Sequence, residues 1–530
     1  MSASAPRWWQ TATIYQIYPR SFQDTNGDGV GDLKGIIDRV PYLKSLDIGA
    51  VWISPFYPSP MRDFGYDISD YCGVDPLFGT MDDFDTLLFE LHRNGLKLIL
   101  DFVPNHTSDQ HPWFKASRAS RHNDFRDWYI WRDGGSGGGP PNNWLSEFGG
   151  AAWTRDEATG QYYYHAFLAE QPDLNWRNPA VRAAMHDAMR FWLRKGVDGF
   201  RIDVMWHLMK DADFRDNPLN PRYEPTRPPH ETLLNVYSAD VDDVHEVVRG
   251  LRGVIDEFDD RLLIGEIYLP FERLAAYYGA ALDGAHLPFN FSLLRATWTA
   301  DEVATLVGAY ESSLPEGAWP NWVLGNHDRP RVASRVGAAQ TRIAALLLLT
   351  LRGTPTLYYG DEIGLPHVRI PQDRIRDPFE QRVPGKGVGR DGARTPMQWS
   401  AQANAGFSVT DPWLPLDENW RTNNVETLDC AANSLLQFYR RLLAFRNSSA
   451  VLQLGQYREM VADQNVLVFV REIGDDWLMV ALNFGDQPAR VQPAPRQGRI
   501  VFGTHDGLVG EVSGAITLRP NEGLIVARAR

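Results

Sequence analysis

The sequence has few cysteines, no long apolar run and a deficit of positive charge. Its 530 residues contain two cysteines, Cys72 and Cys430, which match no metal-binding or redox spacing and favour a reducing, cytoplasmic setting. The longest apolar stretch, residues 343–351, is far shorter than the roughly 20 residues that a membrane-spanning helix needs. Residues 1–10 also lack the apolar core of a secretory signal. We therefore expect a core helix over 343–351 and no membrane partner.

Lys and Arg number 53 against 67 Asp and Glu, which gives a formal net charge of −14. Nucleic-acid binding needs clustered Lys and Arg, so this balance argues against a nucleic-acid partner and favours a neutral substrate. Aromatic residues make up 12% of the chain, and flat rings suit sugar faces, although most of them are expected in the core. Nothing in the sequence indicates an oligomeric state.

Short apolar segments, most of them followed by helix-patterned stretches, recur through the first four-fifths of the chain. The candidate strands are residues 14–18, 50–54, 96–103, 199–204, 262–267, 285–289, 322–326 and 356–359, and the clearest helices are 33–46, 81–94, 179–195 and 241–258. Buried parallel strands read as continuous apolar runs, so eight of them predict an α/β fold, a (β/α)₈ TIM barrel. Its active site is expected at the C-terminal ends of the strands.

Two long insertions and a change of pattern predict the domain organisation. Residues 1–103 form the first part of the barrel, and residues 104–175, with the Gly/Pro-rich run 133–143, form a subdomain inserted after the third strand. The barrel continues over 176–447 and includes a long loop, 367–410, after the eighth strand. Alternating strands without helices then predict a C-terminal antiparallel β-sandwich over 448–530.

Two neighbouring strands carry contrasting carboxylates. Arg201 and Asp203 are two residues apart in a strand and therefore project to the same side, where the cation is expected to keep Asp203 ionised. Glu266 lies alone in an apolar run, and burial is expected to raise its pKa. An ionised Asp and a protonated Glu form the pair that a retaining glycosidase needs, about 5–5.5 Å apart. The alternative is a structural ion pair at Asp203 and a buried, paired carboxylate at Glu266.

Polar clusters also end the third and seventh strands. Asp101 to His106 read DFVPNH, and Gly325 to Asp328 read GNHD. Two histidines with aspartates suggest a metal site, but no third His or Cys follows at ligand spacing, so donors to a hydroxylated ligand are favoured.

The strings DFVPNH (101–106), GFRIDV (199–204), GEIY (265–268) and GNHD (325–328), in this order, resemble four signature regions of the α-amylase superfamily. The resemblance extends over essentially the whole chain. Three further strings, GYD (65–67), QPDLN (171–175) and RTPMQW (394–399), resemble the oligo-1,6-glucosidase and α-glucosidase subgroup.

The resemblance implies a role for each of three carboxylates. Asp203 is the nucleophile that forms a β-glucosyl ester, Glu266 is the acid and then the base, and Asp328 stabilises the transition state through the ring hydroxyls. His106, Arg201 and His327 match the family's donors to the sugar.

The resemblance also implies the shape of the pocket. Tyr66 is the platform under the glucose ring, and Asp63 pairs with Arg394 to close the pocket behind the non-reducing glucose, which makes the enzyme exo-acting. Phe148 and Phe167 are hydrophobic edges of the pocket, or equally subdomain core.

A separate loop, residues 24–32, reads DTNGDGVGD and resembles an EF-hand loop without its final glutamate. Oxygen ligands are expected from Asp24, Asn26, Asp28, the Val30 carbonyl and Asp32, which favours a hard cation. The alternative is a loop rich in Asx turns that bonds only itself. In the resembling subgroup this loop binds Ca²⁺ or Mg²⁺ away from the catalytic centre, so its role is structural.

The favoured function is a retaining α-glucosidase acting on short α-glucosides such as maltose, isomaltose or trehalose. By the resemblance, Val204 after the nucleophile favours α-1,6 linkages, although relatives with Val also accept other linkages. A transglucosidase or glucoside isomerase on the same scaffold stays open, although no RLDRD-type string of sucrose isomerases occurs near strand seven. A non-catalytic amylase-like transporter subunit is the remote alternative, since such subunits have a membrane anchor and have lost the catalytic carboxylates.

Overall fold

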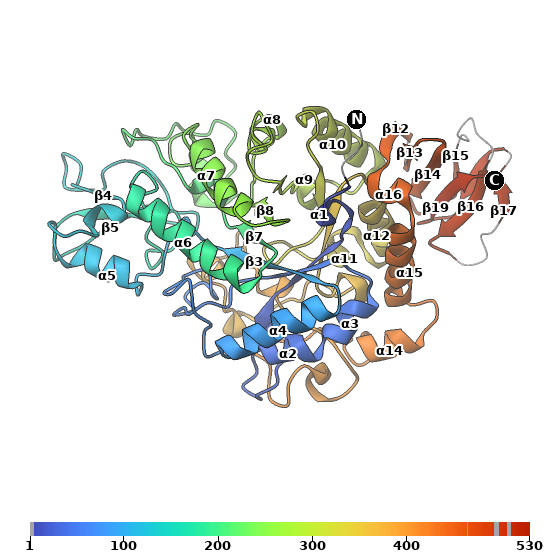
Figure 1. Ribbon diagram of the computed structural model, residues 1–530, viewed down its shortest axis with the longest axis horizontal. Helices are drawn as coiled ribbons and strands as arrows, with labels where there is room; N and C mark the ends of the chain where they lie inside the picture. The colour runs from blue at the N-terminus through green and yellow to red at the C-terminus, as the bar shows by residue number, and fades with distance from the viewer. Residues whose placement is uncertain (1–4, 464, 492–497, 506–509, 513, 530) are drawn as a thin grey trace.

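The computed structural model describes residues 5–463, 465–491, 498–505, 510–512 and 514–529. Eight parallel strands form a nearly closed barrel in the order β10–β11–β1–β2–β3–β7–β8–β9. Three neighbouring strands of this barrel, β3, β7 and β8, are labelled near the centre of Figure 1. Their bounds are β1 (Ile14–Ile17), β2 (Ala50–Ile53), β3 (Lys97–Phe102), β7 (Gly199–Ile202), β8 (Leu262–Gly265), β9 (Leu287–Pro288), β10 (Asn321–Val323) and β11 (Thr354–Tyr358). Each predicted segment overlaps one of these strands, although β10 and β11 begin before the predicted residues, and the predicted TIM barrel is confirmed.

A side chain bridges the one gap in the barrel, where no strand pairing joins the described residues of β9 and β10. Asn321 in β10 donates its Nδ2 to the carbonyl of Pro288, 2.6 Å away, and accepts from the amide of Asn290 at 2.9 Å. Its amide thus replaces the ladder hydrogen bonds that so short a strand cannot supply.

The helices lie outside the strands, as the βα pattern predicts. They are α1 (Trp8–Thr11), α2 (Leu33–Asp38), α3 (Val40–Ser45), α4 (Met81–Arg93), α6 (Pro179–Lys195), α7 (Val244–Asp256), α8 (Phe271–Ala276), α9 (Ser292–Arg295), α10 (Ala300–Ser313), α11 (Val332–Val336), α12 (Thr341–Thr350), α13 (Pro378–Arg382), α14 (Val425–Cys430), α15 (Leu435–Ser448) and α16 (Ala450–Leu454). The apolar stretch is the core helix α12, whose residues are nearly all buried. In the described part of the chain no helix has the length and apolar character to span a membrane.

Local sequence explains where these helices begin and end. Thr80 and Asp83 form a reciprocal capping box at the start of α4. Helix α6 begins with Asn178 as its N-cap and Pro179 in the first turn, and it ends at Gly196, which adopts φ 108°. The single helix predicted over 33–46 is wrong, because the chain breaks at Arg39, just before Pro41, into α2 and α3. Proline has no N–H to continue the preceding helix.

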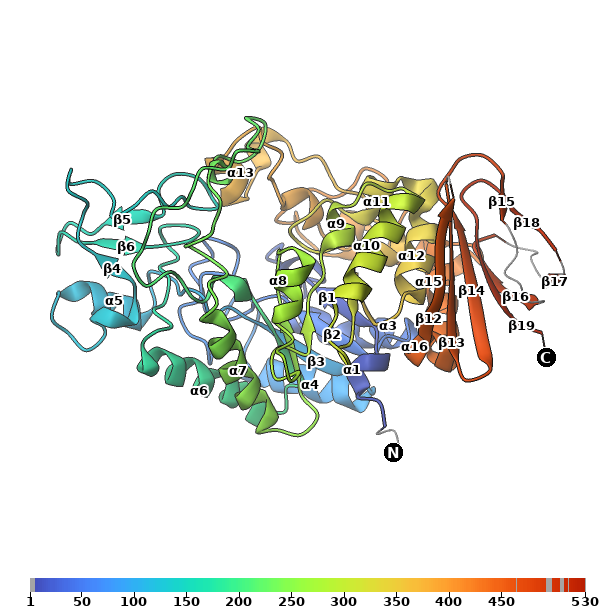
Figure 2. The ribbon, with the colours of Figure 1, turned by 90° about the horizontal axis from the view of Figure 1, so that it is seen from above.

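The inserted segment after β3 lies at the end of the molecule opposite the C-terminal sheets (Figure 2). It contains α5 (Pro112–Ala119) and a three-stranded sheet in the order β4–β6–β5, namely β4 (Trp131–Arg132), β5 (Trp153–Arg155) and β6 (Tyr162–Tyr164). Aromatic residues such as Trp144, Trp153 and Tyr164 form its own small core. Asn143 and Asn217 exchange hydrogen bonds, which join this subdomain to the loop after β7.

The chain ends in antiparallel sheets, which confirms a C-terminal β-domain. Six strands are ordered β12–β13–β14–β19–β16–β17, and two more, β15 and β18, form a separate pair. The strands are β12 (Gln456–Asp463), β13 (Val466–Ile473), β14 (Asp476–Asn483), β15 (Ala489–Val491), β16 (Gly498–Gly503), β17 (Gly510–Val512), β18 (Ile516–Leu518) and β19 (Gly523–Arg528). A buried cluster including Met479, Leu518 and Val526 packs between the two sheets.

Candidate active site

A single buried arginine connects three carboxylates at the C-terminal ends of β3, β7 and β8. Arg201 lies in register with Asp101 on the neighbouring strand, and its Nη1 is 2.9 Å from Asp101 Oδ1 and 2.8 Å from Asp203 Oδ1. Its Nη2 lies 2.7 Å from Oε2 of Glu266. Asp203 and Glu266 directly follow their strands, so the barrel itself brings them together. Asp203 and Glu266 are therefore held on the two Nη atoms of one guanidinium.

Burial and mutual repulsion set the charge of this pair. Burial raises the pKa of Glu266, and burial together with the Glu266 charge raises the pKa of Asp203 well above its usual value. The expectation that Arg201 keeps Asp203 ionised is therefore incomplete, because one guanidinium is divided among three carboxylates. The two carboxyl groups are therefore coupled, and their two ionisation steps belong to the pair.

Backbone strain accompanies the site. Val204, the residue after Asp203, adopts φ 37° and ψ 48°, a left-handed conformation that is unusual for a β-branched residue. In this conformation the Val204 amide donates to Oε2 of Glu266 at 2.9 Å. The strained turn thus fixes the second carboxyl relative to the first.

Asp328, after β10, is held ionised. Burial opposes its ionisation, but Arg394 and Arg390 outweigh burial and keep the pKa of Asp328 well below its usual value. Arg394 Nη2 lies 2.9 Å from Asp328 Oδ1, and Arg390 Nη1 lies 3.6 Å from the same oxygen. Asp328 therefore presents a permanent negative charge to the pocket.

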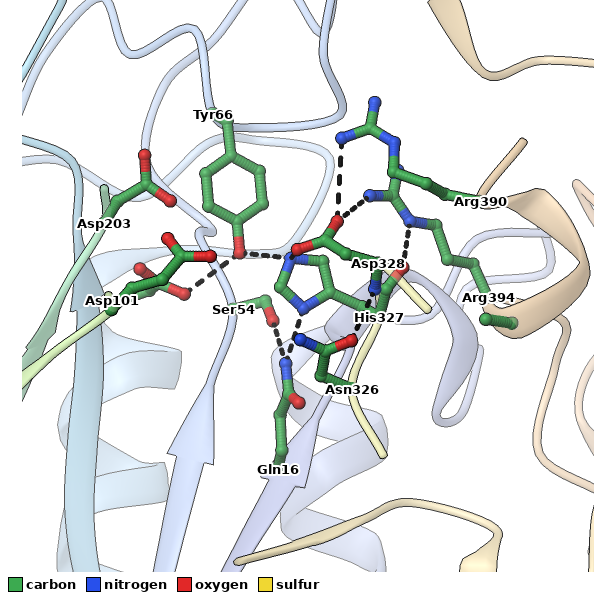
Figure 3. A network of polar contacts seen from close by, with 12 residues as sticks. Gln16, Ser54, Tyr66, Asp101, Asp203, Asn326, His327, Asp328, Arg390 and Arg394 are labelled. Carbon is green, nitrogen blue, oxygen red and sulfur yellow. Dashed lines mark hydrogen bonds and ion pairs between the residues drawn. The ribbon is translucent and has the colours of Figure 1, made fainter. Parts of the chain in front are cut away.

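A chain of hydrogen bonds fixes His327, which Figure 3 shows among Gln16, Tyr66 and Asp328. Burial lowers the pKa of His327 to about 3, so the ring is neutral. Gln16 Nε2 lies 2.8 Å from Nδ1 and the Tyr66 hydroxyl lies 2.8 Å from Nε2. The amide must donate to Nδ1, so Nε2 bears the proton and donates to Tyr66, whose hydroxyl donates to Asp101 at 3.0 Å.

His106 is the second buried histidine of the site. Burial lowers its pKa, and its Nε2 lies 3.0 Å from the carbonyl of Tyr66, to which the ring donates. Tyr66 itself is buried and stacks on His327 at 5.4 Å with an interplanar angle of 4°.

The closed end of the pocket differs from the expectation. Asp63 pairs with Arg390, not with Arg394: Arg390 Nη2 lies 2.7 Å from Asp63 Oδ1 and 2.7 Å from Asp377 Oδ1. Arg394 instead donates to the carbonyl of His327 and supports Asp328 from behind. The predicted pair is therefore wrong in its arginine, although both arginines come from the loop after β11.

These residues enclose a cavity of about 360 Å³. Phe148 and Phe167 both line it, with ring centroids 5.9 Å apart, and Phe148 stacks on Phe379 at 4.8 Å. Of the eleven predicted catalytic and substrate-binding residues, Arg201 and Arg394 lie behind the lining, and the other nine line the cavity. The cavity is thus continuous from the carboxylates to the inserted subdomain.

Most of the chain matches one family. Residues 16–455 match the family described as alpha amylase, catalytic domain. The chain belongs to the α-amylase family. It is 41% identical over 497 residues to a probable alpha-glucosidase of Rhizobium meliloti, covering 91% of this chain and 90% of that protein. It is 37% identical to the oligo-1,6-glucosidase of Parageobacillus thermoglucosidasius, covering 91% of each.

A solved structure extends the likeness to three dimensions. The alpha-glucosyl transfer enzyme XgtA matches with a TM-score of 0.93 and 38% identity, covering 99% of this chain and all of that one. The family match and the two relatives support a glycoside hydrolase of the α-glucosidase type for this member of the α-amylase family.

Several lining residues of this family member were not predicted. They are Glu147, Gln171, Trp206, His207, Pro228, His230, Glu231, Tyr268, Arg295, Arg329, Pro330, Phe379, Lys386, Gly387, Val388, Gly389 and Arg390. Gln171 belongs to the recognised string QPDLN, so a signal for it existed. Most of the others come from loops whose paths only the folded chain reveals.

The cation loop lies away from this cavity and lines no part of it. Asp24 Oδ1 accepts from the amides of Asn26 and Gly27, at 3.0 and 2.8 Å, and Asp28 Oδ1 accepts from the amide of Val30 at 2.8 Å. The donor set of carboxylate, amide and carbonyl oxygens suits a hard cation. The oxygens are nevertheless turned toward the loop's own amides, and no described group of three His, Cys, Asp or Glu is arranged as a metal site. The cation stays a prediction.

Proposed function

We propose that this enzyme is a retaining, exo-acting α-glucosidase that releases α-glucose from the non-reducing end of short α-glucosides. The observation that supports it best is Arg201 bound at once to Asp203 and Glu266 in a cavity that Asp63 and Arg390 line. Inverting enzymes need room for a water molecule between their two carboxyls. Two carboxyls that are held on the two Nη atoms of one guanidinium favour the closer spacing of a retaining pair.

At the start of the first step, Glu266 is protonated and Asp203 is a carboxylate. An Asp203 oxygen attacks the anomeric carbon while Glu266 gives its proton to the glycosidic oxygen, so the leaving group departs as an alcohol. The product is a β-glucosyl ester on Asp203 and a Glu266 carboxylate. Arg201 disperses the charge that moves from one carboxylate to the other.

In the second step Glu266 takes a proton from water, and the resulting hydroxide attacks the anomeric carbon of the ester. The bond to Asp203 breaks, α-glucose leaves, and both side chains return to their starting state. Asp328 is negatively charged throughout and stabilises the positive charge that develops on the sugar in both transition states.

A proton NMR time course with maltose, isomaltose, trehalose and sucrose in separate tubes tests this function. We expect the signal of α-glucose to appear first and then to mutarotate, with the relative rates giving the linkage preference. Initial appearance of β-glucose contradicts the retaining mechanism.

A second function is supported by the likeness to XgtA, which is described as an alpha-glucosyl transfer enzyme. A transglucosidase uses the same residues, but a sugar hydroxyl instead of water intercepts the ester, and a glucoside isomerase returns the glucose to its own leaving group. New glycosidic signals without matching free glucose in the NMR experiment would establish transfer or isomerisation. The remote non-catalytic alternative is disfavoured because all three carboxylates lie together.

The loop 24–32 is proposed to bind Ca²⁺ or Mg²⁺ in a structural role. Asp28 Oδ1 and Asn26 Oδ1 each accept one amide hydrogen bond and retain a further lone pair for a cation. The loop contacts the segment after β11, where Ser408 Oγ donates to Asp24 Oδ2 at 2.6 Å. A cation here is therefore expected to stabilise the junction of two loops and not to take part in either chemical step. A cytoplasmic location likewise stays a prediction, supported by two unpaired cysteines.

A further inference from the structure

Two arginines at the mouth of the cavity have no acidic partner. Arg295, the last residue of α9, and Arg329, the residue after Asp328, both line the cavity. Their guanidinium carbons lie 4.8 and 5.5 Å from the ring centroid of Tyr268. Within the described chain neither side chain has an ion pair or hydrogen bond, unlike Arg201 and Arg390, which bind carboxylates.

Burial of the guanidinium group lowers the pKa of Arg295, and the positive charge of Arg329 lowers it further. The residue as a whole is nevertheless exposed to solvent. Two like charges near one ring repel each other, so an anion between them would be favoured. Lys386 lines the same mouth, and its ammonium group contacts only the carbonyl of Pro225.

The acidic residues at the mouth do not neutralise these cations. Glu147 Oε2 lies 2.9 Å from Nε2 of His230, and this ion pair lowers the pKa of Glu147 to about 2 against the opposing effect of burial. Glu231 Oε2 lies 2.7 Å from Nε of Arg227. The mouth therefore has excess positive charge in a chain whose net charge is −14.

The position of the two arginines identifies the part of a substrate that they meet. Asp63 and Arg390 pair at the end that holds the non-reducing glucose. Tyr268, which both guanidinium groups overlie, is near Glu266, the group that protonates the departing oxygen: burial, and then the Glu266 charge, raise the pKa of Tyr268 to about 12. Arg295 and Arg329 therefore lie on the leaving-group side.

We infer that this side of the cavity selects α-glucosides whose leaving group bears an anionic group, a phosphate or a carboxylate, bound by Arg295 and Arg329. Guanidinium groups bind both anions through paired hydrogen bonds. This inference rests on the proposed α-glucosidase function and specifies its substrate class.

Matched substrates test the inference. Maltitol and maltobionate have open-chain leaving groups that differ in an alcohol against a carboxylate, and maltose and maltose phosphorylated on its reducing glucose form the phosphate pair. We expect kcat/KM to be about tenfold higher for the charged member of at least one pair, and the pair affected distinguishes carboxylate from phosphate. The preference should shrink at about 1 M salt, where the Debye length is about 3 Å.

Variants assign the preference to residues. In the double variant R295Q/R329Q the charged-to-neutral ratio of kcat/KM should fall to about one. Arg490, an exposed arginine on β15, gives the matched control, and R490Q should retain the wild-type ratio. A charged-to-neutral ratio near one in the wild-type enzyme, or an unchanged ratio in the double variant, overturns the inference. If maltose, isomaltose, trehalose and the charged maltose derivatives are all left uncleaved, the proposed function itself fails, so the two failures are distinguishable.

Discussion

Arg390 and Asp63 form an ion pair, 2.7 Å from Nη2 to Oδ1, between residues 327 positions apart in the sequence. The same Nη2 also contacts Asp377, so one guanidinium binds two buried carboxylates. The end of the pocket that defines exo action therefore depends on the docking of the loop after β11 onto the loop after β2.

Replacing Arg390 by Met should lower kcat/KM for maltose by about 100-fold and also lower the melting temperature, because removing one partner of a buried pair costs about 3 kcal/mol or more. Steady-state kinetics and thermal denaturation measure both effects. Arg390→Lys retains the charge without the planar fork and should recover only part of the loss. Full activity in Arg390→Met would contradict this role.

Asp203→Asn should reduce turnover by about 10⁴-fold or more, since the amide does not form the glucosyl ester. The melting temperature at pH 8 should not fall, because the substitution removes a carboxylate that Glu266 repels. Circular dichroism and calorimetry check the fold. Activity like that of the wild type would disprove the nucleophile assignment.

Glu266→Gln should slow the glycosylation step far more for maltose than for an aryl glucoside with a good leaving group, which needs little protonation. Single-turnover kinetics on both substrates measure that step. Equal losses on the two substrates would show that Glu266 is not the acid.

The pH dependence of kcat/KM should be bell-shaped. The active pair holds one proton, so activity falls at low pH as the pair gains a second proton and falls at high pH as it loses its only one. Burial raises the pKa of both groups, so both limbs should lie above the ordinary carboxyl range. In Glu266→Gln, assayed with an aryl glucoside, the alkaline limb should disappear. Its persistence would assign that limb to another group.

Chelation by EDTA should lower the melting temperature by about 3 °C, and added Ca²⁺ or Mg²⁺ should restore it, since a ligand that binds only the folded state stabilises it. The kcat at a temperature well below the transition should change little. Asp28→Asn, which alters an exposed loop carboxylate, should abolish the response to EDTA. An unchanged melting temperature would favour the self-bonded loop.

The fold was predictable where burial produces a local pattern. Strand β3 is nearly all apolar up to Asp101, and the polar residues that follow such strands necessarily gather at one end of a parallel barrel. The junction between β9 and β10 was harder to predict, because it depends on the side chain of Asn321, a residue that is distant in sequence from β9. Its contribution becomes clear only from the three-dimensional contacts.

The catalytic carboxylates were predictable from the sequence, but the contacts of the loop residues around them were not. Asp203, Glu266 and Asp328 each follow a strand, so local sequence and the family strings identify them. The partner of Asp63 was not predictable, because Arg390 and Arg394 lie four residues apart in one irregular loop and both reach Asp328, and only the folded loop brings Arg390 onto Asp63. The mouth of the pocket likewise depends on loop paths that have no periodicity to read.

The cavity is built from the inserted subdomain, from the loops after β7 and β10 and from the loop after β11, all of which meet on one occupant. A sugar analogue that resists hydrolysis therefore contacts all of these segments at once and holds them together. At 100 times its Kd it adds about 2.7 kcal/mol to the free energy of unfolding. Protease cleavage within residues 367–410 should then slow in proportion to occupancy, so resistance to digestion reports binding even in variants that have lost all turnover.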